Sequence, residues 1–277
     1  MSILDAIILG IVQGLTEFLP ISSSGHLILA EYFLKLNVQD LLSFDVAVHF
    51  GTLLAIFVYF AKDYVQMLNT CWDWLVHLLA HRKHSEEMQA TKDSRKFIQY
   101  LIVATIPAVI IGALFSDYIE EHFRQPFTVA ILLIAVGVFF FFAEYIASKV
   151  KHVELNQTNT FVIGVAQTLA LFSGVSRSGA TISAGIIQGI KREEAARFSF
   201  LLGSVAISAA IILSIYKVMK GTLVLPPFEI LATGIITSFV SGYVAISFLL
   251  KFLKKHTLHV FGLYRVIFGF LVLYLLK

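Results

Sequence analysis

The chain has 277 residues, of which 58% are hydrophobic and only 14% are charged, and its mean hydropathy is +0.83. This composition excludes an ordinary soluble domain and predicts a polytopic membrane protein. The formal net charge of +3 comes from loop residues and gives no indication of nucleic-acid binding. Cys71 is the single cysteine, which excludes an intrachain disulfide and a thiolate metal site.

The first half of the chain predicts a re-entrant hairpin followed by three membrane spans. The apolar run from Ile3 stops at Pro20, and the next apolar stretch, 27–36, is too short for a crossing, which needs about 20 residues. We therefore interpret residues 3–36 as a helical hairpin that enters and leaves the membrane on one side. The elements predicted after it are spans over 44–61, 97–115 and 127–147 and an amphipathic interfacial helix over 64–80.

The second half repeats this pattern with a hairpin and three more spans. These elements are predicted over 160–190, 195–216, 228–252 and 258–276. Because each half has an odd number of spans, the second half inserts upside down relative to the first. The sequence thus predicts an all-α membrane protein with an inverted-topology repeat, six transmembrane helices and two re-entrant hairpins. The repeats are residues 1–149 and 150–277 of one integral membrane domain. Most lysines and arginines outside the spans fall on the side of the polar segment 62–96, which the positive-inside rule places in the cytoplasm.

Polar residues interrupt the apolar pattern at the tip of each predicted hairpin. The interruptions are Gln13–His26, with the sequence QGLTEFLPISSSGH, and Ser173–Thr181, with the sequence SGVSRSGAT. A shift of 154 residues, the difference between Gly10 and Gly164, aligns identical Gly, Gln, Leu, Phe and Ser residues in these two segments and the residues just before them. Buried polar groups need partners in lipid, and two related breaks indicate a binding site in a membrane protein. We expect the two tips to meet.

Arg177 is the most informative residue of the second tip. A guanidinium near the bilayer centre costs about 2.5–3.5 kcal/mol on insertion scales, so we expect it to have an anionic partner. A helix begins after the tip, and its first N–H groups can face an anion that the glycines allow to approach. The candidate anion ligands around Arg177 are Gly174, Ser176, Ser178 and Gly179. We interpret the tips as a phosphate site, and the alternative is that Arg177 only pairs with Glu17.

The first tip carries the candidate catalytic groups. Glu17 lies one helical turn after Gln13, and its carboxylate can act as a general base, orient a nucleophile or hold a divalent cation together with Gln13. Alternatively, Glu17 is a buried structural acid. Ser23 is the candidate nucleophile, and His26 is either a proton donor and acceptor or a satisfied buried histidine. The candidate donors and caps beside them are Ser22, Ser24 and Gly25.

Three other intramembrane residues are weaker candidates. Arg265, in the last predicted span, either supplies a second charge to a diphosphate or pairs with a helix-end carbonyl. Asp45 and His49 share a helix face near the end of a span, and we interpret them as side chains that reach toward the interface.

The two motifs resemble those of the bacitracin-resistance type of undecaprenyl-pyrophosphate phosphatases. In that family, Glu or Gln, three residues and Glu precede a serine cluster, a glycine and a histidine, and the second motif reads PGxSRSGAT. Ser173 stands here in place of the proline. The resemblance covers essentially the whole chain. It adds Thr181 to the candidate substrate-binding residues and supports Arg265 through the Tyr264–Arg265 pair.

The resemblance implies hydrolysis of undecaprenyl diphosphate to undecaprenyl phosphate, which recycles a lipid carrier for peptidoglycan synthesis and confers bacitracin resistance. It also implies a divalent cation, Mg or Ca, and a multi-pass protein of the bacterial cytoplasmic (inner) membrane with a site open to the extracytoplasmic side. The oligomeric state stays open, a homodimer included. The alternative is a secondary transporter or flippase of a phosphorylated lipid. The sequence has no DDxxD stretch and no Arg-Pro pair, which argues against a prenyl transferase and against the other lipid-phosphatase superfamily.

Overall fold

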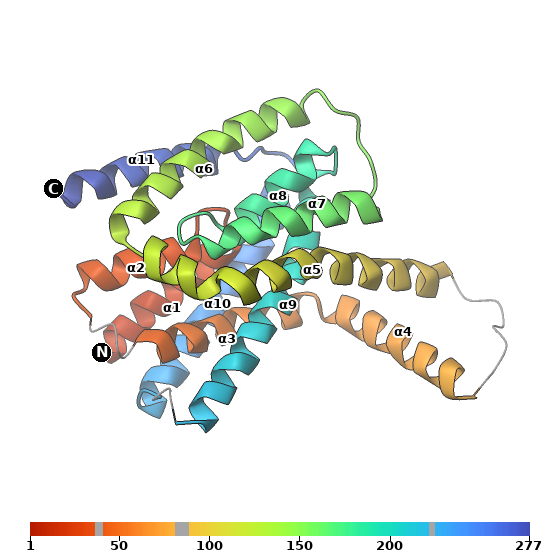
Figure 1. Cartoon of the computed structure of the whole chain (residues 1–277), viewed down its shortest axis with the longest axis horizontal. Coiled ribbons are helices and arrows are strands. Elements are labelled where there is room, and N and C mark those ends of the chain that lie inside the picture. Colours follow the sequence, from red (N-terminus) through yellow and green to blue (C-terminus); the bar gives the residue numbers. More distant parts are fainter. Residues whose placement is uncertain (37–40, 81–88, 222–224) are drawn as a thin grey trace.

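The computed structural model describes residues 1–36, 41–80, 89–221 and 225–277, and over these residues the chain is all-helical (Figure 1). The short elements of the two predicted hairpins are α1 (Ile3–Phe18), α2 (Ser23–Phe33), α7 (Gln157–Thr168), a 3-10 turn (Leu169–Leu171) and α8 (Arg177–Ile187). The longer helices are α3 (Leu41–Tyr59), α4 (Ala61–Ala80), α5 (Gln89–Phe123), α6 (Pro126–Ala147), α9 (Arg192–Met219), α10 (Phe228–Leu253) and α11 (His259–Leu275).

Several of these helices have the length and composition of membrane spans. Within the described residues four helices qualify: Lys92–Phe115, Pro126–Ala147, Arg192–Met219 and Phe228–Leu253. A fifth candidate is the pair Ser43–Tyr59 and Ala61–Val76, whose axes meet at 78°. The predicted span 258–276 falls on α11, an apolar helix of 17 residues. The predicted all-α, multi-pass membrane architecture is therefore confirmed.

The two hairpin tips have the same backbone conformation. Ser22 caps α2 with φ 79°, and Ser176 caps α8 with φ 76°. Each serine hydroxyl accepts a hydrogen bond from a backbone N–H three residues later, that of Gly25 or Gly179. Residues other than glycine rarely adopt a positive φ. The same unusual backbone conformation at two aligned positions is therefore a local structural repeat.

Each hairpin packs against a long helix of the other half of the chain. α1 packs along α10, and α7 packs along α5 (Figure 1). Glycine permits both contacts, because a Cβ on Gly10 would lie 2.9 Å from the carbonyl oxygen of Gly234, and one on Gly164 would lie 2.4 Å from that of Ala104. The two halves are thus interlocked at positions that the 154-residue shift relates.

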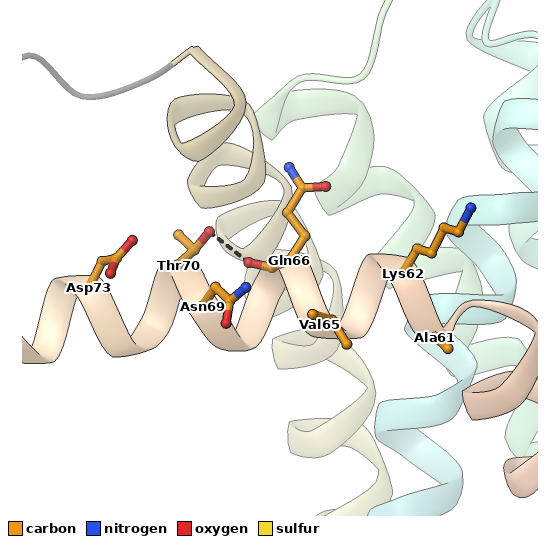
Figure 2. Close-up of a pocket in the computed structure, with 7 residues that line it drawn as sticks. All are labelled: Ala61, Lys62, Val65, Gln66, Asn69, Thr70 and Asp73. Carbon is orange, nitrogen blue, oxygen red and sulfur yellow. Dashed lines mark hydrogen bonds between the residues drawn. The ribbon is translucent and has the colours of Figure 1, made fainter.

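α4 is amphipathic, in agreement with the pattern seen over 64–80. α4 and the start of α5 project away from the other helices (Figure 1). One face of α4 carries Lys62, Asn69 and Asp73, which line a pocket of about 460 Å³ (Figure 2). No predicted site residue lines this pocket. Met67 and Leu68 instead face α5 and α9.

Candidate active site

The two hairpin tips meet, as the sequence predicts. A Cβ on Gly25 would lie 3.3 Å from the Cα of Gly174, so the two backbones are in close contact. The Ser178 hydroxyl donates a hydrogen bond to the carbonyl oxygen of Leu19 at 3.4 Å. Gly174 has φ 108°, a conformation that glycine adopts without steric cost.

Glu17 is the point on which both tips converge. Its buried carboxylate accepts hydrogen bonds from the Ser23 hydroxyl at 2.6 Å, the Gln13 amide at 3.0 Å and the Arg177 guanidinium at 2.9 Å. Ser23 and Arg177 are the first residues of α2 and α8, and the 154-residue shift relates them. A hydroxyl and a cation therefore occupy equivalent positions, and they bind the two oxygens of one carboxylate.

Arg177 is held against α9, and two of its donor nitrogens are unpaired within the described residues. A Cβ on Gly203 would lie 1.6 Å from Nη1 and 2.1 Å from Cζ, so only glycine leaves room for the guanidinium there. Nε and Nη1 of Arg177 are buried and have no hydrogen-bond partner in the described part of the chain. The ion pair with Glu17 uses only Nη2, so it provides no partner for Nε or Nη1.

A cavity of about 720 Å³ opens beside the Glu17 carboxylate. The predicted site residues that line it are Glu17, Ser23, Ser24, Ser176 and Arg177. Apolar side chains of α5 and α9 line much of the remainder, among them Val109, Val205 and Ile207. The cavity thus has a polar end at the hairpin tips and an apolar side between two long helices.

The structure corrects the interpretation of Asp45 and His49, which line this cavity. His49 Nδ1 donates to the backbone carbonyl of Asp45 at 2.6 Å, and Nε2 lies 3.8 Å from a carboxylate oxygen of Glu17. Arg124 donates to the Asp45 carboxylate at 3.2 Å. Asp45 and His49 are spaced i, i+4, like Gln13 and Glu17. A polar pair on one face of an apolar span was the sequence signal that could have identified them as candidate site residues.

Gln167 is a second residue that the sequence reasoning missed. It is the repeat equivalent of Gln13, it lines the cavity, and it is 4% exposed. Neither polar atom of its amide has a hydrogen-bond partner within the described residues. An unpaired buried amide is costly, so its position beside the cavity suits a ligand-binding group. The 154-residue shift aligns Gln167 with Gln13, and this alignment was the sequence signal for it.

His26 lies behind the first tip and does not line the cavity. Its Nδ1 donates to the carbonyl of Ser22 at 2.7 Å, and its Nε2 accepts from the Tyr264 hydroxyl at 2.7 Å. The ring stacks on Phe268 with a centroid separation of 4.8 Å. Both ring nitrogens are engaged, which matches the alternative of a satisfied buried histidine that positions the Ser22 cap.

Thr181 also supports the site from behind. Its fully buried hydroxyl donates to the carbonyl of Arg177 at 2.8 Å and pairs with the Ser199 hydroxyl at 2.6 Å. This bond fixes the first turn of α8 and so the base of the Arg177 side chain. Thr181 does not line the cavity, and its contacts are those of a positioning residue.

Arg265 joins the two tips through their backbones. It is fully buried, and its guanidinium donates to the carbonyls of Pro20 at 3.3 Å, Gly174 at 2.6 Å and Leu132 at 3.4 Å. It does not line the cavity. The interpretation of Arg265 as a second charge for a diphosphate is therefore corrected, because backbone carbonyls already occupy its donors.

The remaining predicted residues form the frame of the tips. The Ser178 hydroxyl lies 3.1 Å from that of Ser176, and a Cβ on Gly179 would lie 2.8 Å from the ring of Phe140. Gln13 is fully buried behind Glu17. Gln13, Ser178 and Gly179 set the shape of the site and do not line the cavity, whereas Ser176 does.

The oxygens of Glu17 and Gln13 are of the types that fit a divalent cation. The described residues contain no group of three or more His, Cys, Asp and Glu side chains arranged to hold a metal. However, Gln13 Oε1 is buried and has no hydrogen-bond partner among these residues, and its amide lies against Glu17. Mg²⁺ commonly takes one or two carboxylates together with phosphate oxygens, and amide oxygens are also suitable ligands.

The helices and the buried Glu–Ser–Arg centre define a multi-pass membrane protein with a buried polar centre between two hairpin tips. The chain belongs to the family described as bacitracin resistance protein BacA, whose model matches residues 6–271. It is similar to proteins named undecaprenyl-diphosphatase from Rubrobacter xylanophilus (41% identical, covering 100% of this chain and 99% of the relative) and Geotalea daltonii (42%, 99% and 98%). The family resemblance seen in the motifs is confirmed.

Proposed function

We propose that this chain is an undecaprenyl-diphosphate phosphatase, which hydrolyses its lipid substrate to undecaprenyl phosphate and phosphate. The observation that carries the proposal is the convergence of Ser23, Glu17 and Arg177 beside a cavity with an apolar side. A lipid diphosphate has a charged headgroup for the polar end and a hydrocarbon chain for the apolar side. The relatives that match this chain over its full length are named for this reaction.

In the proposed reaction the terminal phosphate lies between Ser23 and Arg177. The Ser23 oxygen attacks phosphorus, while Glu17, 2.6 Å from that oxygen, accepts the hydroxyl proton. The bond between phosphorus and the bridging oxygen breaks, and undecaprenyl phosphate leaves with the bonding electrons. Water then attacks the phosphoserine, which releases phosphate and restores the hydroxyl.

Positive charge at the tips stabilises the phosphoryl group as it transfers. Arg177 offers Nε and Nη1, and the N-termini of α2 and α8 add their backbone N–H groups. A divalent cation held by Gln13 and Glu17 would neutralise further charge on the phosphate oxygens when bound. His49, whose Nε2 is 3.8 Å from Glu17, replaces His26 as the histidine that passes the proton on.

The fold that carries this site is proposed to be the inverted repeat of residues 1–149 and 150–277, with six spans and two re-entrant hairpins. The matched caps at Ser22 and Ser176 and the interlocked packing of α1 with α10 and α7 with α5 support it. The distribution of basic residues supports a cytoplasmic location of segment 62–96. The family resemblance supports a place in the bacterial cytoplasmic membrane with the cavity open to the extracytoplasmic side.

Phosphate release by purified protein in detergent tests the function directly. Undecaprenyl diphosphate should yield phosphate with the wild-type chain and none with Arg177→Ala, whose folding is checked by thermal unfolding. A transporter or flippase would instead move the lipid across vesicle membranes without releasing phosphate. A wild-type protein that releases no phosphate from any prenyl diphosphate would refute the proposal.

A further inference from the structure

A second, almost wholly apolar cavity of about 500 Å³ lies between α4, α5 and α9. We call it the α4–α5–α9 groove. Its lining includes Met67 and Leu68 of α4, Ile102 and Ile106 of α5 and Leu201 of α9. Several of these side chains are largely exposed, so the groove lies at the surface of the helix bundle, where a membrane protein meets lipid.

The groove adjoins the cavity at the hairpin tips and shares part of its wall with it. Thr105 and Val109 of α5 and Val205 of α9 line both spaces. A ligand whose charged end lies at Glu17 and Arg177 can therefore extend between α5 and α9 into the groove without leaving the protein surface.

The few polar groups in the groove are already paired with one another or with the backbone. The Tyr64 hydroxyl donates to the Ser204 hydroxyl at 2.6 Å, and Ser204 donates to the carbonyl of Leu201 at 2.7 Å. The Thr105 hydroxyl donates to the carbonyl of Leu101 at 2.7 Å. The groove thus offers its occupant an apolar surface with its hydroxyls satisfied, which suits hydrocarbon and disfavours a polar ligand.

We propose that the α4–α5–α9 groove binds the part of the prenyl chain that extends beyond the tip cavity. This inference rests on the proposed function, because it assigns the chain of the same substrate whose headgroup lies at Glu17. The shared lining residues indicate the path of the prenyl chain, which runs from the tips past Thr105 and Val205 toward Met67 and Leu68. The groove gives the enzyme a means to prefer long prenyl diphosphates over short ones.

Cys71 provides a test in the unmodified protein, because the only cysteine of the chain lines the groove and is exposed. Undecaprenyl phosphate should slow the reaction of Cys71 with N-ethylmaleimide in detergent, whereas inorganic pyrophosphate should not. Equal reaction rates with and without the lipid would overturn the assignment. Equal protection by undecaprenol, which has the chain but no phosphate, would also overturn it, since the headgroup would then not direct the chain.

A chain-length comparison provides the second test. Ile106→Trp fills the groove from α5 at a position that does not line the tip cavity. Leu114→Trp is its control on the same helix, because Leu114 is 69% exposed and lies outside both cavities. Each buried methylene contributes roughly a factor of four to binding, so displacing one isoprene unit should cost more than tenfold.

The expected result is that kcat/KM for undecaprenyl diphosphate falls more than tenfold relative to kcat/KM for dimethylallyl diphosphate in Ile106→Trp. Leu114→Trp should leave this ratio unchanged. A parallel loss on both substrates, or no loss on either, would overturn the groove assignment. A wild-type protein inactive on every prenyl diphosphate would instead refute the proposed function, so the two failures are distinguishable.

Discussion

Gly203 gives the sharpest test of how the fold positions Arg177. In Gly203→Ala the new Cβ would lie 1.6 Å from Nη1, whereas ordinary contact begins at 3.4 Å, so the guanidinium must move by about 1.8 Å. The hydrogen bond to Glu17 is now 2.9 Å long and cannot survive such a shift unchanged. Since a misplacement of about 1 Å can cost roughly 100-fold in rate, we expect kcat/KM to fall by about 100-fold or more.

The assay is phosphate release from undecaprenyl diphosphate, with thermal unfolding measured in parallel. Alanine is a better helix former than glycine by roughly 1 kcal/mol, so α9 itself should not be weakened. Gly112→Ala is the matched control, because its Cβ would meet its nearest neighbour, Leu171, at 3.9 Å on the wall of the same cavity. Near-normal turnover by Gly203→Ala, beside an inactive Arg177→Ala, would refute the claim that α9 fixes the guanidinium.

Four further predictions concern the same site. Ser23→Ala should lose far more activity than Ser24→Ala in the phosphate-release assay, and the reverse order would reassign the nucleophile. Glu17→Gln should lower kcat by about 10²–10⁴-fold, as expected for loss of a general base, and unchanged kcat would exclude that role. A chelator should abolish activity and added Mg²⁺ or Ca²⁺ should restore it; indifference to the chelator would remove the cation from the mechanism. Arg265→Met should destabilise the protein by about 3 kcal/mol or more, seen as a lower unfolding temperature, because charge-assisted bonds to both tips are lost; unchanged stability would contradict this role.

The two hairpin tips and the contact between them were predictable from sequence, because polar residues buried in a membrane need polar partners. Arg177 has no reason to lie in an apolar segment without a carboxylate or an anion, and Glu17 is the acid of the other polar segment. The 154-residue shift then aligned Ser22 with Ser176, and the structure gives both the same capping geometry. The polar residues and the internal repeat were therefore enough to predict that the two tips meet.

The direction in which a side chain faces was not predictable, because it depends on contacts between distant segments. His26 and Arg265 belong to recognisable motifs, yet Tyr264 and the carbonyl of Gly174 turn them away from the cavity. His49 has no motif at all and reaches Glu17 only because α3 packs beside α1. Motif membership identified residues of the site but could not separate those that contact a ligand from those that hold the site together.

In the proposed mechanism, the matching backbone of the two tips allows one carboxylate to bind both the nucleophile and a positive charge. The caps at Ser22 and Ser176 are alike, so the residues that follow them, Ser23 and Arg177, project from equivalent positions toward Glu17. Two serines at these positions would leave the phosphoryl charge unneutralised, and two arginines would repel each other and supply no nucleophile. The proposed reactive site therefore depends on two tips with the same backbone conformation and on different residues, Ser23 and Arg177, at one pair of equivalent positions.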